Sequence, residues 1–128
     1  MQTKIKVLVV EDHQIAQKVA LIILNNLNCE VNIAKNGIEA LEFVQQKQYD
    51  LILMDIGLPD LDGLTLTKNI RNIEDKLCPV PIIGLTAHVG EQIRLQAIEA
   101  GMNDLFVKPL LKEKCLIILN KFVVKKID

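Results

Sequence analysis

Short apolar runs alternate with amphipathic segments along the whole chain. A short run of apolar or β-branched residues is typical of a buried strand, and apolar residues three or four positions apart are typical of a helix. The predicted strands lie at residues 4–10, 31–33, 51–54, 82–85 and 105–107. The predicted helices carry apolar residues at Ile15, Val19, Ile22 and Ile23; at Ile38, Leu41 and Val44; at Leu66, Ile70 and Ile73; at Ile93, Ala97 and Ile98; and at Leu116, Leu119, Phe122 and Val123.

This regular alternation predicts a parallel sheet, because parallel neighbours need crossover helices that then cover both faces of the sheet. The fold class is therefore α/β, a doubly wound sheet of five parallel strands with five helices. In the last helix, Leu116, Leu119, Phe122 and Val123 are expected to face inward. No repeat, low-complexity stretch or linker interrupts the series, so residues 1–128 are expected to form a single domain with no attached output domain.

The composition excludes several other classes of protein. Hydrophobic residues make up 50% of the chain, which is not the composition of a disordered protein. The 15 basic and 16 acidic residues give a net charge of −1, so we expect no direct binding to nucleic acid. The first apolar run is too short to span a membrane and does not resemble a signal peptide. Cys29, Cys78 and Cys115 show no CxxC spacing and are interpreted as buried, reduced thiols of a cytoplasmic protein.

Polar residues follow four of the predicted strands. Glu11 and Asp12 end the first strand, Asp55 the third, Thr86 the fourth and Lys108 the fifth. In an open parallel sheet the ligand site lies beyond the carboxyl ends of the strands. One acid at a strand end is usually a turn or cap residue, but caps do not explain this joint occurrence. The sequence therefore predicts one polar pocket.

The residue types in this pocket indicate phosphoryl chemistry with a divalent metal. Neighbouring carboxylates repel each other unless a cation neutralises them, and an all-oxygen site suits magnesium, with manganese as an alternative. Asp55 lies centrally, so its carboxylate is the predicted nucleophile toward phosphorus. The metal, the Thr86 hydroxyl and the Lys108 ammonium would then stabilise the phosphoryl oxygens.

Five short motifs include these strand ends and the loop after Asp55: Val9-Val10-Glu11-Asp12, Leu53-Met54-Asp55, Leu58-Pro59-Asp60-Leu61-Asp62-Gly63, Leu85-Thr86-Ala87 and Val107-Lys108-Pro109. Through these motifs, and over essentially its whole length, the chain resembles the receiver domains of two-component response regulators. The resemblance implies a flavodoxin-like receiver fold with strand order 2-1-3-4-5. It also implies that Asp55 accepts the phosphoryl group, which Thr86 and Lys108 contact. The implied magnesium ligands are Glu11, Asp12, Asp55 and the backbone carbonyl of Gly57.

The resemblance further implies a role in a phosphorelay. A histidine kinase or a histidine phosphotransfer domain would donate the phosphoryl group, and a shift in the face built from the fourth helix, fifth strand and fifth helix would signal to a downstream protein. The donor or target would dock there or near the first helix. Such a domain is a switch rather than an enzyme, limited to self-catalysed phosphotransfer and slow autodephosphorylation. Residues 100–110 are most similar to receivers of hybrid sensor histidine kinases.

Four residues near the pocket qualify this interpretation. The family often has an aromatic residue three positions before the lysine, where this chain has Leu105, so a different or smaller conformational readout is expected. Phe106 is expected on the opposite face of the strand. The resemblance implies a cis bond between Lys108 and Pro109. His88 is either at the pocket rim, where it would influence attack by water, or a solvated loop residue.

Other readings fit less well. His13 is not expected to bind the metal, because magnesium prefers oxygen ligands. Aspartate-nucleophile phosphatases of the haloacid-dehalogenase type have an Asp-x-Asp motif after the first strand. This chain has Glu11-Asp12-His13 there. A degenerate receiver that only binds partners would lack an essential residue, and none is missing. A P-loop or dinucleotide site would need a glycine-rich motif after the first strand, and the sequence has none there.

Overall fold

Five parallel strands form a single sheet in the computed structural model, which describes residues 4–74 and 79–123. The strands are β1 (Ile5–Val10), β2 (Cys29–Ala34), β3 (Leu51–Asp55), β4 (Ile82–Thr86) and β5 (Asp104–Val107). Their order is β2-β1-β3-β4-β5, and each neighbouring pair is parallel. The predicted strand order is confirmed, and β3 lies at the centre.

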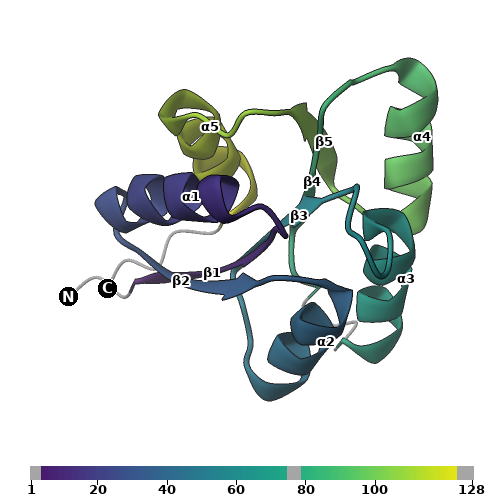
Figure 1. Ribbon diagram of the computed structural model, residues 1–128, viewed down its shortest axis with the longest axis horizontal. Helices are drawn as coiled ribbons and strands as arrows, with labels where there is room; N and C mark the ends of the chain where they lie inside the picture. The colour runs from purple at the N-terminus through teal and green to yellow at the C-terminus, as the bar shows by residue number, and fades with distance from the viewer. Residues whose placement is uncertain (1–3, 75–78, 124–128) are drawn as a thin grey trace.

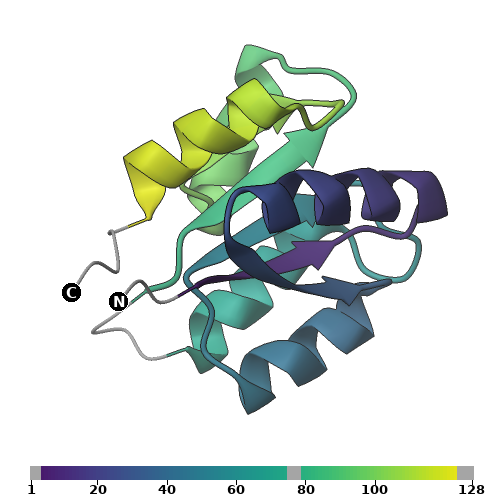
Figure 2. The ribbon, with the colours of Figure 1, turned by 90° about the vertical axis from the view of Figure 1, so that its left-hand side faces the viewer.

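Helices cover both faces of this sheet (Figures 1 and 2). They are α1 (Gln14–Asn26), α2 (Gly37–Gln46), α3 (Gly63–Ile73), α4 (Glu91–Ala100) and α5 (Lys112–Phe122). The first and last helices lie on one face, and α2, α3 and α4 lie on the other. The prediction of a doubly wound α/β fold is confirmed. In the described part of the chain, no helix has both the length and the apolar character needed to cross a membrane.

The two faces of the sheet carry separate apolar cores. Along β1, Val7 and Val9 belong to the cluster under α1 and α5, whereas Leu8 and Val10 belong to the cluster under α2, α3 and α4. This alternation follows from the two-residue period of a strand. All five residues of β3 are buried, because this strand has neighbours on both sides and helices on both faces. Asp55 therefore ends the most enclosed strand.

On α1, the apolar spacing predicted the helix but not the face that is buried. Ala20 and Leu24 are its buried residues. Ile15 and Ile22 are 71% and 63% exposed. Each residue turns a helix by about 100°, so Ile15 and Ile22 lie on the opposite side of α1 from Ala20 and Leu24.

On α5, the prediction that Leu116 faces inward is wrong, because its side chain is 41% exposed. Cys115 and Ile118 are the buried residues of this helix, and Leu119 and Phe122 are partly buried against the same cluster. These inward residues recur three or four positions apart, and each helical step rotates a side chain by about 100°. Leu116 therefore lies at the side of the buried stripe.

Two cysteines are described, and both are buried and free. Burial raises the pKa of Cys29 to about 11, with a further contribution from the charge of Asp50. Burial likewise raises the pKa of Cys115 to about 11. Both thiols therefore stay protonated at neutral pH. The prediction that these two cysteines are buried is confirmed. Cys78 lies outside the described residues.

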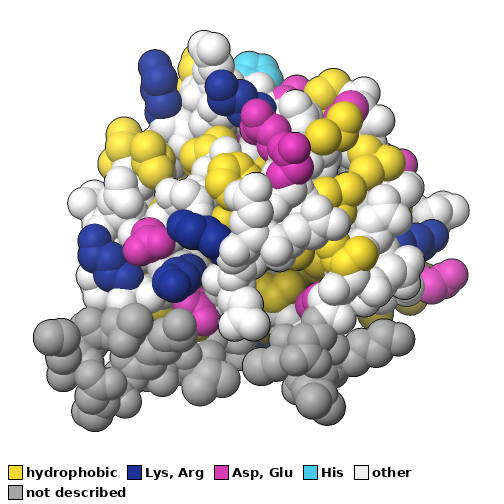
Figure 3. Space-filling view, turned by 90° about the horizontal axis from the view of Figure 1, so that it is seen from below, with side chains coloured by type: hydrophobic (Ala, Val, Ile, Leu, Met, Phe, Trp, Pro, Cys, Tyr) yellow, Lys and Arg dark blue, Asp and Glu magenta, His cyan; other side chains and the backbone are white. Residues whose placement is uncertain are grey.

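The molecular surface on the side of α2 and α3 is mixed in character. Figure 3 shows charged side chains of both signs among patches of apolar side chains on this face. The formal net charge of the whole chain is −1. The described residues of this face therefore present mixed charge rather than a field of one sign.

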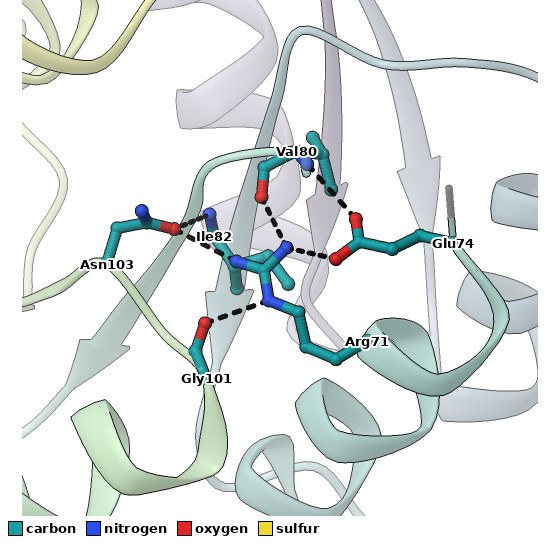
Figure 4. Close-up of polar contacts among 6 residues, drawn as sticks. All are labelled: Arg71, Glu74, Val80, Ile82, Gly101 and Asn103. Atoms are coloured by element: carbon teal, nitrogen blue, oxygen red, sulfur yellow. Dashed lines mark hydrogen bonds and ion pairs between the residues drawn. The ribbon is translucent and has the colours of Figure 1, made fainter. Parts of the chain in front are cut away.

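Arg71 joins three segments near the starts of β4 and β5 (Figure 4). Its Nε donates to the Gly101 carbonyl (2.9 Å) and its Nη1 to the Val80 carbonyl (2.7 Å). Nη1 also pairs with Glu74 Oε1 (2.7 Å), and Nη2 donates to Asn103 Oδ1 (3.0 Å). The guanidinium fork thus connects the end of α3, the start of β4 and the turn between α4 and β5.

We expect Arg71→Ala to lower the free energy of unfolding by about 2–4 kcal/mol, because the partly buried carbonyls of Val80 and Gly101 would lose a charged donor. Equilibrium denaturation in urea, followed by circular dichroism, measures this change. Arg94→Ala is the control. Its side chain is 45% exposed and pairs with Asp104 at 2.7 Å, so the loss there should be about 1 kcal/mol or less. Equal losses in the two variants would contradict a special anchoring role for Arg71.

Candidate functional site

Three carboxylates meet at the carboxyl ends of two adjacent strands. Glu11 and Asp12 directly follow β1, and Asp55 is the last residue of β3, which pairs with β1. One oxygen of each carboxylate lies within 4.8 Å of the others. Glu11 and Asp55 are only 5% and 6% exposed, whereas Asp12 is exposed. The parallel register therefore produces the predicted acidic pocket.

Lys108, which follows β5, extends across to this cluster. Its Nζ lies 3.0 Å from Asp55 Oδ2 and 3.4 Å from Glu11 Oε1. Burial by itself would lower the pKa of Lys108, but the hydrogen bond and charge of Asp55, together with Glu11, raise it overall. The lysine therefore remains a cation in the pocket. It supplies one positive charge against three carboxylates.

The Glu11 carboxyl is harder to ionise than an ordinary glutamate. Burial raises its pKa, and the charge of Asp55 raises it further. The His13 backbone N–H, which donates to Glu11 Oε2 at 3.1 Å, and the charge of Lys108 act in the opposite direction. By count, three carboxylates face one ammonium, so the ionised pocket has excess negative charge. The atoms that could bind a metal ion here are carboxylate oxygens, which are ligands that magnesium prefers.

The loop between β3 and α3 folds back tightly beneath this pocket. The Gly63 N–H donates to the Ile56 carbonyl at 2.8 Å. A Cβ at Gly63 would lie 2.7 Å from the Asp55 carbonyl oxygen and 2.8 Å from the Ile56 Cα, closer than atoms can pack. Asp62 then caps α3 by accepting from the Thr65 N–H at 2.9 Å. This loop includes Gly57, whose N–H donates to Asp55 Oδ1 at 3.0 Å.

Thr86 lies at the end of β4, but its hydroxyl is engaged within its own loop. The hydroxyl donates to the His88 carbonyl at 3.1 Å and accepts a longer bond of 3.4 Å from the His88 N–H. The Thr86 carbonyl accepts from the Lys108 N–H at 2.7 Å, which joins β4 to the segment after β5. The Thr86 backbone therefore lies beside Lys108, whereas the Thr86 hydroxyl bonds to the backbone of its own loop instead of pointing to Asp55. His88 is exposed, and its effect on attack by water stays a prediction.

The predicted arrangement of β5 and the residues after it is confirmed. Leu105 is 2% exposed and packs in the core under α2, α3 and α4. Phe106 packs against the other core, as expected from its position on the strand. The Lys108–Pro109 peptide bond is cis. His13 is exposed at the N-terminal end of α1 and is not part of the carboxylate cluster.

The sequence analysis missed two residues that support the site. Lys114, on α5, donates to the carbonyls of Val107 and Pro109, on either side of Lys108. Asp60, in the loop after Asp55, hydrogen-bonds to the start of α2. Neither contact has a local sequence signal, because each depends on how separate elements pack.

The sequence profile of the response regulator receiver domain matches residues 7–120. This span includes every residue of the pocket. The chain belongs to the response regulator receiver domain family. Receiver domains are phosphorylatable signalling switches, and the acidic pocket at Asp55 lies within the matched residues.

Curated relatives of the receiver domain come from two kinds of protein. The hybrid signal transduction histidine kinase K of Dictyostelium discoideum is 38% identical over 119 residues, which cover 88% of this chain and 10% of the relative. The transcription factor SKN7 of Candida albicans is 35% identical over 118 residues, which cover 92% of this chain and 21% of the relative. The likeness to hybrid kinases is confirmed, and a transcription factor matches equally well, at similar identity and over slightly more of the chain. The chain spans about a fifth or less of these relatives.

Solved receiver structures share the whole fold. The receiver domain of the sensor histidine kinase PA1611 from Pseudomonas aeruginosa, with magnesium coordinated in its active site cleft, has a TM-score of 0.84 and 37% identity. The alignment covers 94% of this chain and 98% of that one. The receiver domain of Ssk1 from Saccharomyces cerevisiae, in complex with the histidine phosphotransfer protein Ypd1, has a TM-score of 0.87 and 30% identity, with coverage of 96% and 91%.

We expect Gly63→Ala to lower the free energy of unfolding by about 2–3 kcal/mol, because the new methyl group would press on the backbone that carries Asp55. Urea denaturation measures the change. Gly57→Ala is the matched control in the same loop, where the nearest atom to a new Cβ is Asp55 Oδ1 at 3.9 Å. This control should change the free energy by about 0.5 kcal/mol or less. A similar loss in both variants would show that the loop is not tightly packed at Gly63.

Proposed function

We propose that this domain accepts a phosphoryl group on Asp55 from a phosphohistidine donor, in a reaction that depends on magnesium. The supporting observation is the setting of Asp55, which is 6% exposed and lies between the Gly57 N–H and the Lys108 ammonium. Residues 1–128 would act as a single receiver domain in the cytoplasm. The buried, free thiols of Cys29 and Cys115 are compatible with that compartment.

The residues of the pocket suit a single displacement at phosphorus. A carboxylate oxygen of Asp55 would attack the phosphorus atom, and the bond from phosphorus to the imidazole nitrogen of the donor would break. The product is an acyl phosphate on Asp55, and the released imidazole takes up a proton. Lys108, already 3.0 Å from Asp55 and held protonated, would stabilise the charge on the transferred oxygens. Hydrolysis would then be slow and self-catalysed.

Magnesium, with manganese as an alternative, would be held by Glu11, Asp12, Asp55 and the carbonyl of Gly57. The clustering of carboxylate oxygens within 4.8 Å supports this assignment. A bound divalent cation supplies positive charge for both the carboxylates and the phosphoryl oxygens. The excess negative charge of the pocket would then be neutralised, which also favours approach of an anionic phosphoryl group.

The signalling step would begin at Thr86. Its hydroxyl now bonds to the His88 backbone, and it would turn toward the phosphoryl oxygens once they are present. Leu105 would repack in response, because it lies directly against β4: a Cβ at Gly84 would be 2.8 Å from Leu105 Cδ1. The face made by α4, β5 and α5 would change, and a downstream protein would read that change. His88 would border the path of the attacking water.

The competing functions have less support. In a haloacid-dehalogenase-type phosphatase the nucleophile follows the first strand, whereas Asp55 ends β3. A receiver that only binds partners would have no need of a buried Asp55 paired with Lys108. The phosphoacceptor function is therefore preferred.

We expect the wild-type domain, incubated with magnesium and acetyl phosphate, to gain one phosphoryl group by intact mass spectrometry. Asp55→Asn and wild type with a chelator should gain none, because the first lacks the nucleophile and the second lacks the cation. Asp104→Asn, a matched change on β5 that faces Arg94, should be labelled like wild type. Labelling of Asp55→Asn, or none on folded wild type with magnesium, would contradict the proposal.

The phosphohistidine donor is proposed to dock on α1. Ile15, Val19 and Ile22 form an apolar stripe on this helix and are 71%, 40% and 63% exposed. Because α1 begins at Gln14, just after Asp12, the stripe starts beside the pocket. A histidine phosphotransfer protein with an apolar surface could cover the stripe and present its phosphohistidine to Asp55. The complex of the Ssk1 receiver domain with Ypd1 supports this class of partner.

We expect Ile22→Ser to slow phosphotransfer from a histidine phosphotransfer protein about tenfold, which corresponds to about 1.4 kcal/mol of lost contact. Labelling by acetyl phosphate should not change, because α1 carries no pocket residue. Ile38→Ser is the matched control, since Ile38 is also 63% exposed but lies on α2, across the sheet. Radiolabel transfer kinetics provide the measurement. Equal slowing by both variants would place the docking surface elsewhere.

A further inference from the structure

Asp60 connects the loop after β3 to a different helix. Its Oδ1 accepts from the Gly37 N–H at 2.9 Å, and its Oδ2 accepts from the Ile38 N–H at 3.2 Å. These donors are the first N–H groups of α2, which have no partner within the helix. The same helix already has its own cap, because Asn36 Oδ1 accepts from the Glu39 N–H at 2.9 Å. The start of α2 is therefore bound by one side chain of its own and by one from the loop.

The contact between the loop and α2 is closely fitted. A Cβ at Gly37 would lie 3.0 Å from the Leu61 Cβ and 3.4 Å from Asp60 Oδ1, so a larger residue at position 37 would push the loop away. Gly37 is itself buried. On the other side of Asp60, Leu58 is 8% exposed and belongs to the core under α2, α3 and α4. The tip of the loop is thus fixed against α2 by packing and by hydrogen bonds.

Gly57 lies in this same loop, close to the anchored tip. Its N–H already bonds to Asp55 Oδ1, and the base of the loop is closed by the bond from Gly63 to Ile56. Asp60 is three positions after Gly57, a span of about 11 Å at full extension. An anchor so near limits how far the Gly57 backbone can move. Ligands of a metal ion must be held to within about 0.5 Å, so such an anchor matters for binding.

The carboxylate is well suited to hold this contact at neutral pH. The hydrogen bond from the Gly37 N–H, aided by that from Ile38, keeps the pKa of Asp60 below its ordinary value. The N-terminal end of a helix also attracts negative charge. Asp60 therefore stays ionised and bonded even though it is exposed at the surface.

We propose that Asp60 is a positioning residue, which ties the loop to α2 and thereby holds the Gly57 carbonyl where it can bind magnesium. This inference rests on the proposed function, in which Gly57 is a metal ligand. It also implies reciprocity, because an anchor that strengthens metal binding must itself be strengthened by the metal. Magnesium should therefore slow hydrogen exchange of the Gly37 and Ile38 amides.

The test compares Asp60→Ala with Asn36→Ala, because both remove a cap from the same helix but only the first releases the loop. Magnesium affinity is measured by calorimetry on the phosphate-free domain, and urea denaturation measures stability. We expect Asp60→Ala to raise the Kd for magnesium about tenfold, within the usual range of coupling between sites. Asn36→Ala should lower stability and leave the Kd unchanged. Asp60→Asn, which keeps one acceptor oxygen, should give an intermediate Kd.

A second readout is hydrogen exchange by NMR in the absence of metal. Asp60→Ala should speed exchange of the Gly57 amide, whereas Asn36→Ala should not. If Asp60→Ala does not fold, Asp60→Asn gives the same comparison. An unchanged Kd in a folded Asp60 variant, or an equal rise in Asn36→Ala, would overturn this inference alone. A wild-type domain that binds no magnesium would overturn the proposed metal site and this inference together.

Discussion

The pocket depends on keeping mutually repelling carboxylates together in a place that water hardly reaches. Glu11 and Asp55 are 5% and 6% exposed, and oxygens of both lie within 4.8 Å of Asp12. Two ionised carboxylates at that distance repel by about 3 kcal/mol at an effective dielectric constant of about 20. The parallel sheet supports this arrangement because its strand ends are fixed by the packing of two cores. Lys108 offsets only part of the repulsion, so the site favours a further cation.

The two ends of the sheet differ in how they are held. At the pocket, short loops carry the chemistry, and their positions depend on Gly63 and on hydrogen bonds such as those of Asp62. At the opposite end, Arg71 joins α3, β4 and the turn after α4 through one rigid side chain. The core between them contains the fully buried β3. The strands thus carry loops that end at the pocket, which is the arrangement expected of a binding site on an α/β sheet.

Most of the fold and the charged residues of the site were predictable from local patterns. Apolar runs predicted the strands, and polar residues at the ends of those runs predicted the pocket residues Glu11, Asp12, Asp55 and Lys108. Local patterns failed where packing decides the outcome. Leu116 has suitable spacing but is exposed, because the spacing of apolar residues does not say which stripe faces the sheet. The contact of Asp60 with Gly37 and the direction of the Thr86 hydroxyl are tertiary features that no short motif contains.

The guanidinium of Arg71 holds the carboxyl end of α4. It bonds to Gly101 at the carboxyl end of α4, whereas Gly90, at the amino end, has no side-chain cap. The helix has ten residues, so it is about 15 Å long. If its carboxyl end acts as a pivot, a tilt of about 10° would move its amino end by about 2.6 Å, given that length. With such a pivot α4 would act as a lever with its fulcrum at Arg71, and a small rotation would become a larger displacement at the far end of the helix.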